Sequence, residues 1–528
     1  MAKVLKVGIV GAGISGLAAA KELAQYDPVV FEATDSIGGV WRHCSFRTTK
    51  LQTPRMDYEF SDFPWEDRSQ SFPTHAEIVE YLHGYATHFD LWRHIRLNSK
   101  VVELRFLGGR DASSADLWGS GGKPLPGQPM WEVGVCTGQS ATVEWYRFEF
   151  LVMCIGKYGD VPKMPSYPYK GGPDLDEEAT KGLMRGKKVV IVGYKKSAID
   201  MAVECAEANQ GENGQPCTMV IRTLHWTVPH YSIWGLPFFL FFSTRSSQFL
   251  HERPNQGMMR SLVCRLASPL RSGMSRFIES YLKWKLPLEK YGLVPDHPFV
   301  EDYASCQMAI LPETFFSEAD EGRIKFRKSS KWWFWEKGVV LDDGTRLEAD
   351  VVLLATGYDG KKKLARCCQS PSAACWRTPT ASSLSTGEDS GGAPSSSSGT
   401  IHPLIPRMAF IGYIESVSNL HTSELRCKWL SRLLDGHFKL PSAERMFRQT
   451  AEETEIMKRT TRFYKRHCIS TFSINHSDEM CEEMGWESWR KPSWFSEAFS
   501  PYGSQDYTEE AATGAEEQEE EEKMAAVN

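Results

Sequence analysis

The feature that most limits the fold is a glycine motif near the N-terminus, set between a strand-like and a helix-like stretch. An apolar run, residues 6–10, leads into Gly11-Ala12-Gly13-Ile14-Ser15-Gly16, and residues 17–23 have a helix-forming composition. A second apolar run, residues 29–31, ends at Glu32. The order strand, G-x-G-x-x-G, helix, strand and acid predicts a dinucleotide-binding βαβ unit.

Each residue type in this motif has a physical reason. Gly11 permits a tight turn, Gly13 lets a pyrophosphate approach backbone N–H groups, and Gly16 lets the helix pack closely on the strand. Glu32 can accept hydrogen bonds from ribose hydroxyls. The alternative is a glycine-rich turn in another α/β fold. The paired glycines of Gly38-Gly39-Val40-Trp41 suit a loop against a flat ligand, which together with Glu32 favours FAD over NAD.

A second unit of the same kind follows much later. Residues 187–192 predict a strand that leads into Gly193-Tyr194-Lys195-Lys196-Ser197-Ala198 and a helix. Lys195 replaces the expected middle glycine, so this motif is incomplete. The next strand, residues 217–221, ends in Arg222 and not in an acid, which favours the 2′-phosphate of NADPH over NADH. Lys195 and Lys196 either add charge to a phosphate site or are solvated.

A third strand, residues 350–354, closes on Ala355-Thr356-Gly357, where we expect the chain to return to the first domain. Residues 152–156 mark the corresponding exit. The sequence therefore predicts an α/β protein of two Rossmann-like dinucleotide-binding domains, with the NADPH domain inserted into the FAD domain. The predicted parts are an FAD domain at 1–170, 326–363 and 400–505, an NADPH domain at 186–325, an aberrant low-complexity insert at 364–399 and an acidic disordered tail at 506–528.

Composition narrows the partners and the compartment. A net charge of −6 gives no reason to expect nucleic acid. The 13 cysteines contain no CxxC pair, which predicts reduced thiols in an intracellular protein, either cytoplasmic or at the cytosolic face of the endoplasmic reticulum. No apolar run approaches the roughly 20 residues that span a bilayer. Residues 236–242 form the longest apolar candidate, which either touches a membrane surface, lines a tunnel or is buried.

These motifs together resemble the flavin-containing monooxygenases that carry two dinucleotide sites, over about residues 5–505. Four further segments resemble the plant members that N-hydroxylate pipecolic acid in systemic immunity, and they lie outside the cofactor loops. They are Phe60-Ser61-Asp62-Phe63-Pro64-Trp65, Gly235-Leu236-Pro237-Phe238-Phe239-Leu240, Asp302-Tyr303-Ala304-Ser305-Cys306-Gln307-Met308 and Phe463-Tyr464-Lys465-Arg466-His467-Cys468.

The resemblance implies a monooxygenase that uses NADPH and O2, through a C4a-hydroperoxyflavin, to N-hydroxylate a small amine such as pipecolic acid in plant defence. It implies FAD contacts at Gly11, Gly13, Gly16, Glu32, Gly39 and Trp41, and NADPH contacts at Gly193, Ser197, Ala198 and Arg222. Further cofactor-binding residues, not assigned to one cofactor, are Val40, Gln52, Thr53, Thr356 and Gly357. Gln52 takes the place of an Asn near the flavin and is the one catalytic candidate, although a plain loop residue is the alternative. Thr422 or Ser423 either faces the flavin or caps a helix.

Two departures from the family pattern weaken these expectations. An F-x-G-x-x-x-H segment is missing at residues 169–176, and residues 365–399 replace a structured connection with a Ser-, Pro- and Gly-rich stretch. The alternatives are an indole-3-pyruvate-type flavin monooxygenase, a catalytically impaired cofactor-binding homologue, and a flavin disulfide reductase, which would need a CxxC pair. The histidines show no metal-ligand spacing, so we expect no metal site. The sequence leaves the oligomeric state open.

Overall fold

The first sheet forms around the predicted strand–helix–strand unit. In the computed structural model, β1 (Leu5–Val10) and β2 (Val29–Phe31) are parallel, and α1 (Ile14–Glu22) connects them. Both strands are largely buried, as expected for a parallel sheet that is covered on both faces. The structure describes residues 5–47, 49–67, 71–108, 124–140, 142–159, 161–163, 182–367, 399–403 and 405–509.

Seven strands build this sheet, in the order β3-β2-β1-β6-β5-β4, with β18 beside β6. The further strands are β3 (Ile95–Arg96), β4 (Ser99–Phe106), β5 (Trp131–Thr137), β6 (Val143–Met153) and β18 (Met408–Phe410). β6 pairs with β5 through its first half and with β18 through its last residues. Since β18 follows the second domain in the chain, the first sheet closes around an insertion.

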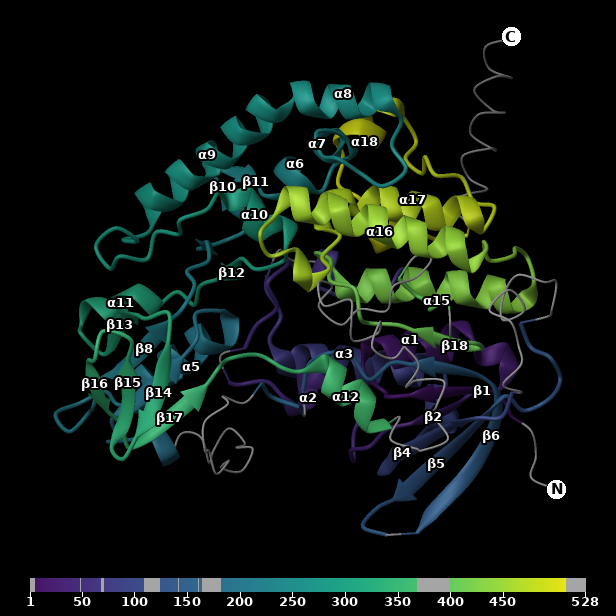
Figure 1. Cartoon of the computed structure of the whole chain (residues 1–528), viewed down its shortest axis with the longest axis horizontal. Coiled ribbons are helices and arrows are strands. Elements are labelled where there is room, and N and C mark those ends of the chain that lie inside the picture. The colour runs from purple at the N-terminus through teal and green to yellow at the C-terminus, as the bar shows by residue number, and fades with distance from the viewer. Residues whose placement is uncertain are drawn as a thin grey trace.

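The second sheet is fully parallel, in the order β13-β8-β7-β17. A small antiparallel sheet adjoins it in sequence, and Figure 1 shows both at the left of the molecule, away from the first sheet. This arrangement confirms the predicted α/β class with one dinucleotide-binding domain inserted into another. The elements are β7 (Val189–Val192), α5 (Lys196–Ala208), β8 (Cys217–Ile221), β13 (Ile324–Lys328), β14 (Trp332–Trp335), β15 (Gly338–Leu341), β16 (Arg346–Glu348) and β17 (Val351–Leu354).

Helices from the C-terminal half cover the first sheet and reach the second domain. α15 (Asn419–Asp435) packs on α1, and α17 (Ser473–Glu483) packs on α15. Figure 1 shows α15, α16 and α17 lying above the first sheet, with α8 and α9 along the top edge of the molecule. The remaining helices are α2 (Val40–His43), α3 (His75–His88), α6 (Phe239–Phe242), α7 (Arg245–Phe249), α8 (Met258–Leu266), α9 (Ser268–Lys285), α10 (Phe299–Ala304), α11 (Phe315–Asp320), α12 (Gly360–Cys367), α16 (Ala443–Thr460) and α18 (Trp494–Phe499).

Short elements complete the part of the chain that the structure describes. The short strands are β9 (Thr227–Val228), β10 (Ser232–Ile233), β11 (Leu236–Pro237) and β12 (Ala309–Ile310). The 3-10 helices are η1 (Ala24–Tyr26), η2 (Arg55–Asp57), η3 (Leu91–His94), η4 (Tyr464–Arg466), η5 (Ser470–Phe472) and η6 (Ser504–Asp506). Among the described helices, none is long and apolar enough to cross a membrane.

Several predicted domain boundaries are wrong. The boundary at residue 326 lies inside β13, and β17 pairs with β7, so the second domain continues to Leu354. The sequence misses this because the final strand of a parallel sheet lies far along the chain from its partner. The predicted insert was to begin at residue 364, but α12 continues to Cys367. The predicted disordered tail was to begin at residue 506, but the described structure continues to Glu509 and Tyr507 is buried. The predicted missing segment at 169–176 and most of the insert at 364–399 lie outside the described residues.

The prediction of reduced thiols is also wrong for one pair of cysteines. Cys306 and Cys468 form a disulfide, with their Cα atoms 6.0 Å apart and 162 residues between them in sequence. Cys306 follows α10 of the second domain, and Cys468 lies in the segment that pairs with Glu415 of the first. Only folding brings these two positions together, so their spacing in sequence gave no indication of the bond.

Candidate functional site

The glycine loop after β1 has the geometry that a bound diphosphate requires. Gly11 has a φ of +101°, in the region that favours glycine, and a Cβ on Gly16 would stand 1.9 Å from the Gly11 carbonyl oxygen. A Cβ on Gly13 would meet only Gly39, at 3.7 Å. No side chain caps the first turn of α1, so its N–H groups can bind an anion.

Glu32 closes this loop from the end of β2. It is buried, and one carboxylate oxygen accepts the Ala12 N–H at 2.8 Å. The other oxygen accepts the N–H and the hydroxyl of Thr34, at 3.0 and 2.9 Å. The carboxylate thus ties the glycine loop to the second strand, at the position where an acid meets a ribose in such folds.

The loop after β2 lies against the same glycines. Gly39 has a φ of +56°, and Val40, the first residue of α2, is exposed. The Trp41 indole N–H donates to the Tyr58 hydroxyl at 3.0 Å, which fixes the ring. Thr53 is buried, and its hydroxyl has no hydrogen-bond partner among the described residues. An unsatisfied buried hydroxyl beside this loop fits a flavin-binding position.

Gln52 connects the two domains. Its side-chain oxygen accepts the N–H of Ile310, in β12 of the second domain, at 3.1 Å. Since this bond crosses from the first domain to the second, Gln52 is more than a plain loop residue. Its predicted catalytic role stays a prediction, because the described residues do not test contact with a flavin.

The start of α15 touches the glycine loop from the opposite side. The Ser423 hydroxyl lies 3.0 Å from that of Ser15 in α1, and a Cβ on Gly412 would meet the Ser15 hydroxyl at 2.4 Å. Ser418 caps α15 by accepting the His421 N–H. Thr422 and Ser423 were predicted either to face the flavin or to cap this helix, and the cap is instead Ser418. Sequence reasoning missed Ser15 and Gly412, although a glycine two residues after β18 was a usable signal.

The second glycine loop rests on the end of β17. Gly193 has a φ of +142°, and a Cβ there would stand 2.7 Å from the Ala355 carbonyl oxygen. Thr356 donates its hydroxyl to the Lys163 carbonyl at 2.8 Å, and Gly357 has a φ of +87°. The Ala355-Thr356-Gly357 turn thus follows the last strand of the second sheet and borders its glycine loop, although the sequence analysis placed residues 326–363 in the FAD domain.

The two lysines of this loop differ in their surroundings. Lys196 pairs with Asp200 at 2.6 Å, one helical turn later. Lys195 is half-buried at the N-cap of α5 and has no hydrogen bond or ion pair with another of the described residues. Burial, together with the charge of Arg466, lowers the pKa of Lys195 to about 7. A phosphate beside Lys195 would offset this desolvation, so the site fits NADPH at Lys195 and not at Lys196.

The other predicted NADPH residues lie at the same edge of the sheet. Arg222 directly follows β8 and is exposed, where it can reach a 2′-phosphate. Ser197 is exposed in the first turn of α5, whereas Ala198 is fully buried and contributes packing at its side chain.

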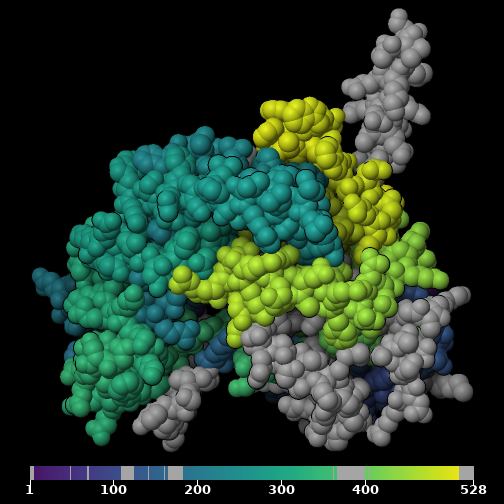
Figure 2. Space-filling model, turned by 45° about the horizontal axis from the view of Figure 1, so that its top comes forward, coloured from purple at the N-terminus to yellow at the C-terminus, as the bar shows by residue number. Residues whose placement is uncertain are grey.

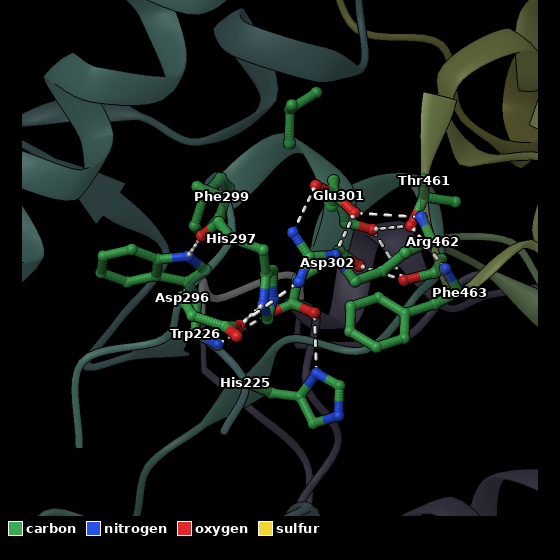
Figure 3. Close-up of polar contacts among 12 residues, drawn as sticks. His225, Trp226, Asp296, His297, Phe299, Glu301, Asp302, Thr461, Arg462 and Phe463 are labelled. Carbon is green, nitrogen blue, oxygen red and sulfur yellow. Dashed lines mark hydrogen bonds and ion pairs between the residues drawn. The ribbon is translucent and has the colours of Figure 1, made fainter. Parts of the chain in front are cut away.

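A buried cluster of one carboxylate and two histidines lies in the second domain, where both histidine rings contact Phe463 of the first domain (Figure 3). Asp302 lies 2.7 Å from His225 Nδ1 and 2.9 Å from His297 Nε2. Burial alone would raise the pKa of Asp302, but hydrogen bonds from both histidines outweigh it and lower the pKa. These three side chains could hold a metal ion, but Asp302 already accepts a direct hydrogen bond from His225 and lies at ion-pair distance from His297. We therefore assign them to a hydrogen-bonded cluster.

The same region carries the bonds between the domains. Arg462 donates to Glu301 at 3.0 Å, and the Thr461 hydroxyl donates to the Glu301 carbonyl at 3.0 Å (Figure 3). The Ser470 hydroxyl donates to the Tyr303 carbonyl at 2.7 Å. Together with the disulfide, these bonds fix α10 to the 461–470 segment and hold the second domain against the first.

A cavity lies where the two domains meet the C-terminal segment, with about 70 Å³ of empty space. Its walls carry one carboxylate, Asp57, beside Tyr231, and a guanidinium, Arg426, on α15. Hydroxyl groups and two histidines supply most of the other polar lining, from Ser416, Ser418, His421, Thr422, Ser473, His476, Ser477 and Ser504. Sequence reasoning missed Asp57, which follows Gln52 by five positions.

Comparison with known proteins identifies the family. The profile described as "Flavin-binding monooxygenase-like" matches residues 4–362 and 402–498. The chain belongs to this family. It is 57% identical over 519 residues to the probable flavin-containing monooxygenase 1 of Arabidopsis thaliana, covering 95% of this chain and 96% of that protein. Over 495 residues it is 50% identical to the putative flavin-containing monooxygenase 2 of the same plant, covering 91% and 97%.

Solved structures share the fold of this flavin-containing monooxygenase at low identity. The structure of OTEMO in complex with FAD and NADP has a TM-score of 0.62 at 18% identity, covering 97% of this chain and 98% of that one. The S-allyl-L-cysteine S-oxygenase of Allium sativum has a TM-score of 0.51 at 17% identity, covering 98% of each chain.

The enzyme class and the cofactors follow from this membership. The chain is an oxidoreductase that depends on FAD, NADPH and O2, as the motifs predicted. The alternative of a flavin disulfide reductase is excluded by the family. The assignment of individual residues to FAD and NADPH stays a prediction that the geometry described above supports.

Proposed function

We propose that this monooxygenase N-hydroxylates a small amine or amino-acid metabolite, with pipecolic acid in plant defence as the first candidate. The observation that carries the proposal is the interdomain cavity and the polar groups in its lining. It combines a carboxylate, which suits an ammonium group, with a guanidinium and hydroxyls, which suit a carboxylate. A zwitterionic amino acid presents both groups.

The chain itself positions and shields the reactants. FAD, when bound, supplies the redox chemistry that activates oxygen. The glycine loop after β1 binds its diphosphate, and Lys195 and Arg222 bind the phosphates of NADPH. Gln52 accepts a hydrogen bond from Ile310 and so fixes the position of one cofactor domain relative to the other. The hydrogen bonds between the α10 region and residues 461–470 hold the interface closed and exclude water from it.

The test is turnover by the purified, FAD-loaded protein. With NADPH, O2 and pipecolic acid, we expect a product that is one oxygen atom heavier than the substrate, detected by mass spectrometry. Indole-3-pyruvate, assayed in parallel, tests the alternative substrate. Anaerobic bleaching of the flavin by NADPH with no product from either compound would contradict the proposal. No bleaching at all would favour a catalytically impaired homologue.

We also propose that the enzyme is intracellular and that one face of it contacts a membrane surface without crossing the membrane. Large apolar side chains are exposed along α8 and α9 and on the neighbouring α18, including Met258 at 90%, Leu266 at 72% and Trp494 at 71% exposure. Figure 2 shows the teal surface of the α8–α9 region meeting the yellow surface of the C-terminal region. The apolar run at residues 236–242 is only partly exposed, since Leu236 and Leu240 are exposed and Phe238 and Phe242 are buried.

Charge supports an anionic bilayer as the partner of this face. Residues 258–285 contain six Lys or Arg and one Glu, in a chain whose net charge is −6. An amphipathic basic surface of this kind binds anionic lipid. We expect co-sedimentation with phosphatidylserine vesicles and much less with phosphatidylcholine vesicles. Leu266→Asp should abolish it, whereas Trp333→Asp, an exposed position on β14, should not. Equal binding by both variants would contradict the proposal.

A further inference from the structure

A half-buried carboxylate without a cation is the feature of the cavity that the fold leaves unexplained. Asp57 ends η2 and lines the cavity, and no ion pair joins it to a Lys, Arg or His among the described residues. The Tyr231 hydroxyl of the second domain hydrogen-bonds to this carboxylate. A carboxylate in such a place ordinarily has a charged partner, because its desolvation is otherwise uncompensated.

The other charged groups nearby do not provide that partner. Glu59, on the same segment, is also acidic, so its charge makes ionisation of Asp57 harder. Burial lowers the pKa of His421 to about 3, so this cavity-lining imidazole is neutral near pH 7. Arg426 donates to the Thr422 carbonyl at 3.0 Å and lies 2.7 Å from His476 Nε2.

These surroundings set the proton affinity of Asp57. Burial raises the pKa of Asp57 to about 6, with the hydrogen bond from the Tyr231 hydroxyl opposing the rise and the charge of nearby Glu59 adding to it. A carboxylate with a raised pKa is a better base near neutral pH than an ordinary one. The cavity volume of about 70 Å³ suits an ammonium group and the carbons next to it.

We propose that Asp57 receives the ammonium group of the amine substrate and takes one proton from it. The N–H bond of the ammonium breaks, its electron pair stays on nitrogen, and the proton moves to a carboxylate oxygen of Asp57. The neutral amine that remains carries the lone pair that N-hydroxylation needs. Tyr231 acts as a positioning residue that orients the carboxylate. This inference rests on the proposed N-hydroxylation and names the base within it.

The proposal is tested with Asp57→Asn, using an amine and a neutral sulfide as parallel probes. The amine is pipecolic acid and the sulfide is methyl p-tolyl sulfide, which needs no deprotonation. We expect kcat/KM for the amine to fall about 100-fold, within the range of general-base contributions, and kcat/KM for the sulfide to fall much less, because the sulfide gives up no proton. Calorimetry on the oxidised, NADP⁺-bound enzyme should show weaker amine binding in the variant, which is a readout independent of turnover.

The pH profile separates a base from a merely structural residue. In the wild type, kcat/KM for the amine should rise with pH through about 6 as Asp57 ionises, and Asp57→Asn should lack this limb. Tyr231→Phe removes only the hydroxyl that favours the ionised form of Asp57, so the rise in kcat/KM should move to higher pH. Equal losses with both probes, unchanged amine binding in Asp57→Asn, or an unmoved limb in Tyr231→Phe would each overturn the proposal.

The outcome is distinguishable from failure of the proposed function. If the wild type does not oxidise pipecolic acid, the proposed function fails for that substrate. Calorimetry with pipecolic acid and with piperidine still reports whether amine binding depends on Asp57, and an amine that binds wild type and Asp57→Asn equally would overturn the role of Asp57.

Discussion

Replacing Gly16 with alanine gives the sharpest test of the glycine loop. The new Cβ would stand 1.9 Å from the Gly11 carbonyl oxygen, where contacts under 3.0 Å are essentially never found. The obstacle is backbone, so α1 must move by about 1 Å, although Leu17 and the three alanines after it are fully buried. Overpacking of this kind costs about 3 kcal/mol, which corresponds to a fall in Tm of about 3 °C if the chain of 528 residues unfolds as one unit.

Gly13→Ala is the matched control in the same loop. Its Cβ would stand 3.7 Å from Gly39, an ordinary contact, and the φ of Gly13 is −76°, which alanine adopts readily. We therefore expect a nearly unchanged Tm. The added methyl instead blocks the diphosphate from the N–H groups of α1, and the loss of one or two charged hydrogen bonds weakens FAD binding by about 10- to 100-fold.

The assay combines thermal unfolding of the apoprotein by circular dichroism with titration of FAD by quenching of its fluorescence. Gly16→Ala should lower Tm even without FAD, and Gly13→Ala should lower FAD affinity at constant Tm. A Gly16→Ala apoprotein as stable as the wild type would refute the steric argument. A Gly13→Ala protein that binds FAD normally would refute the placement of the diphosphate.

Three further perturbations test the domain interface and the second cofactor site. Binding of a phosphate should raise the pKa of Lys195, so the affinity for NADP⁺, measured by calorimetry, should fall as pH rises above about 7. Lys195→Met should remove this dependence and Lys196→Met should retain it; the reverse pattern would contradict the assignment. Gln52→Leu leaves the Ile310 N–H without its acceptor, so we expect about 1–3 kcal/mol lower stability and faster hydrogen exchange at β12, and unchanged exchange would argue against the contact. Alkylation and mass spectrometry of the unreduced protein should leave Cys306 and Cys468 unmodified, and modification of both would contradict the disulfide.

The sequence alone determined the two nucleotide-binding units. Strand, glycine loop, helix and acid are consecutive in the chain, so local spacing predicted Gly11, Gly13, Gly16 and Glu32 together, and the structure places all four around one loop. The family and both cofactors followed from the same motifs. The insertion of one domain into the other followed from the order of the motifs.

Tertiary structure alone decided how the domains meet. The Cys306–Cys468 disulfide spans 162 residues, Gln52 binds a strand 258 residues away, and Asp57 meets Tyr231 only across the interface. The last strand of the second sheet, β17, was assigned to the wrong domain because its partner β7 lies far back in the chain. Contacts of this kind depend on which buried surfaces match after folding, and no periodicity or local motif encodes them.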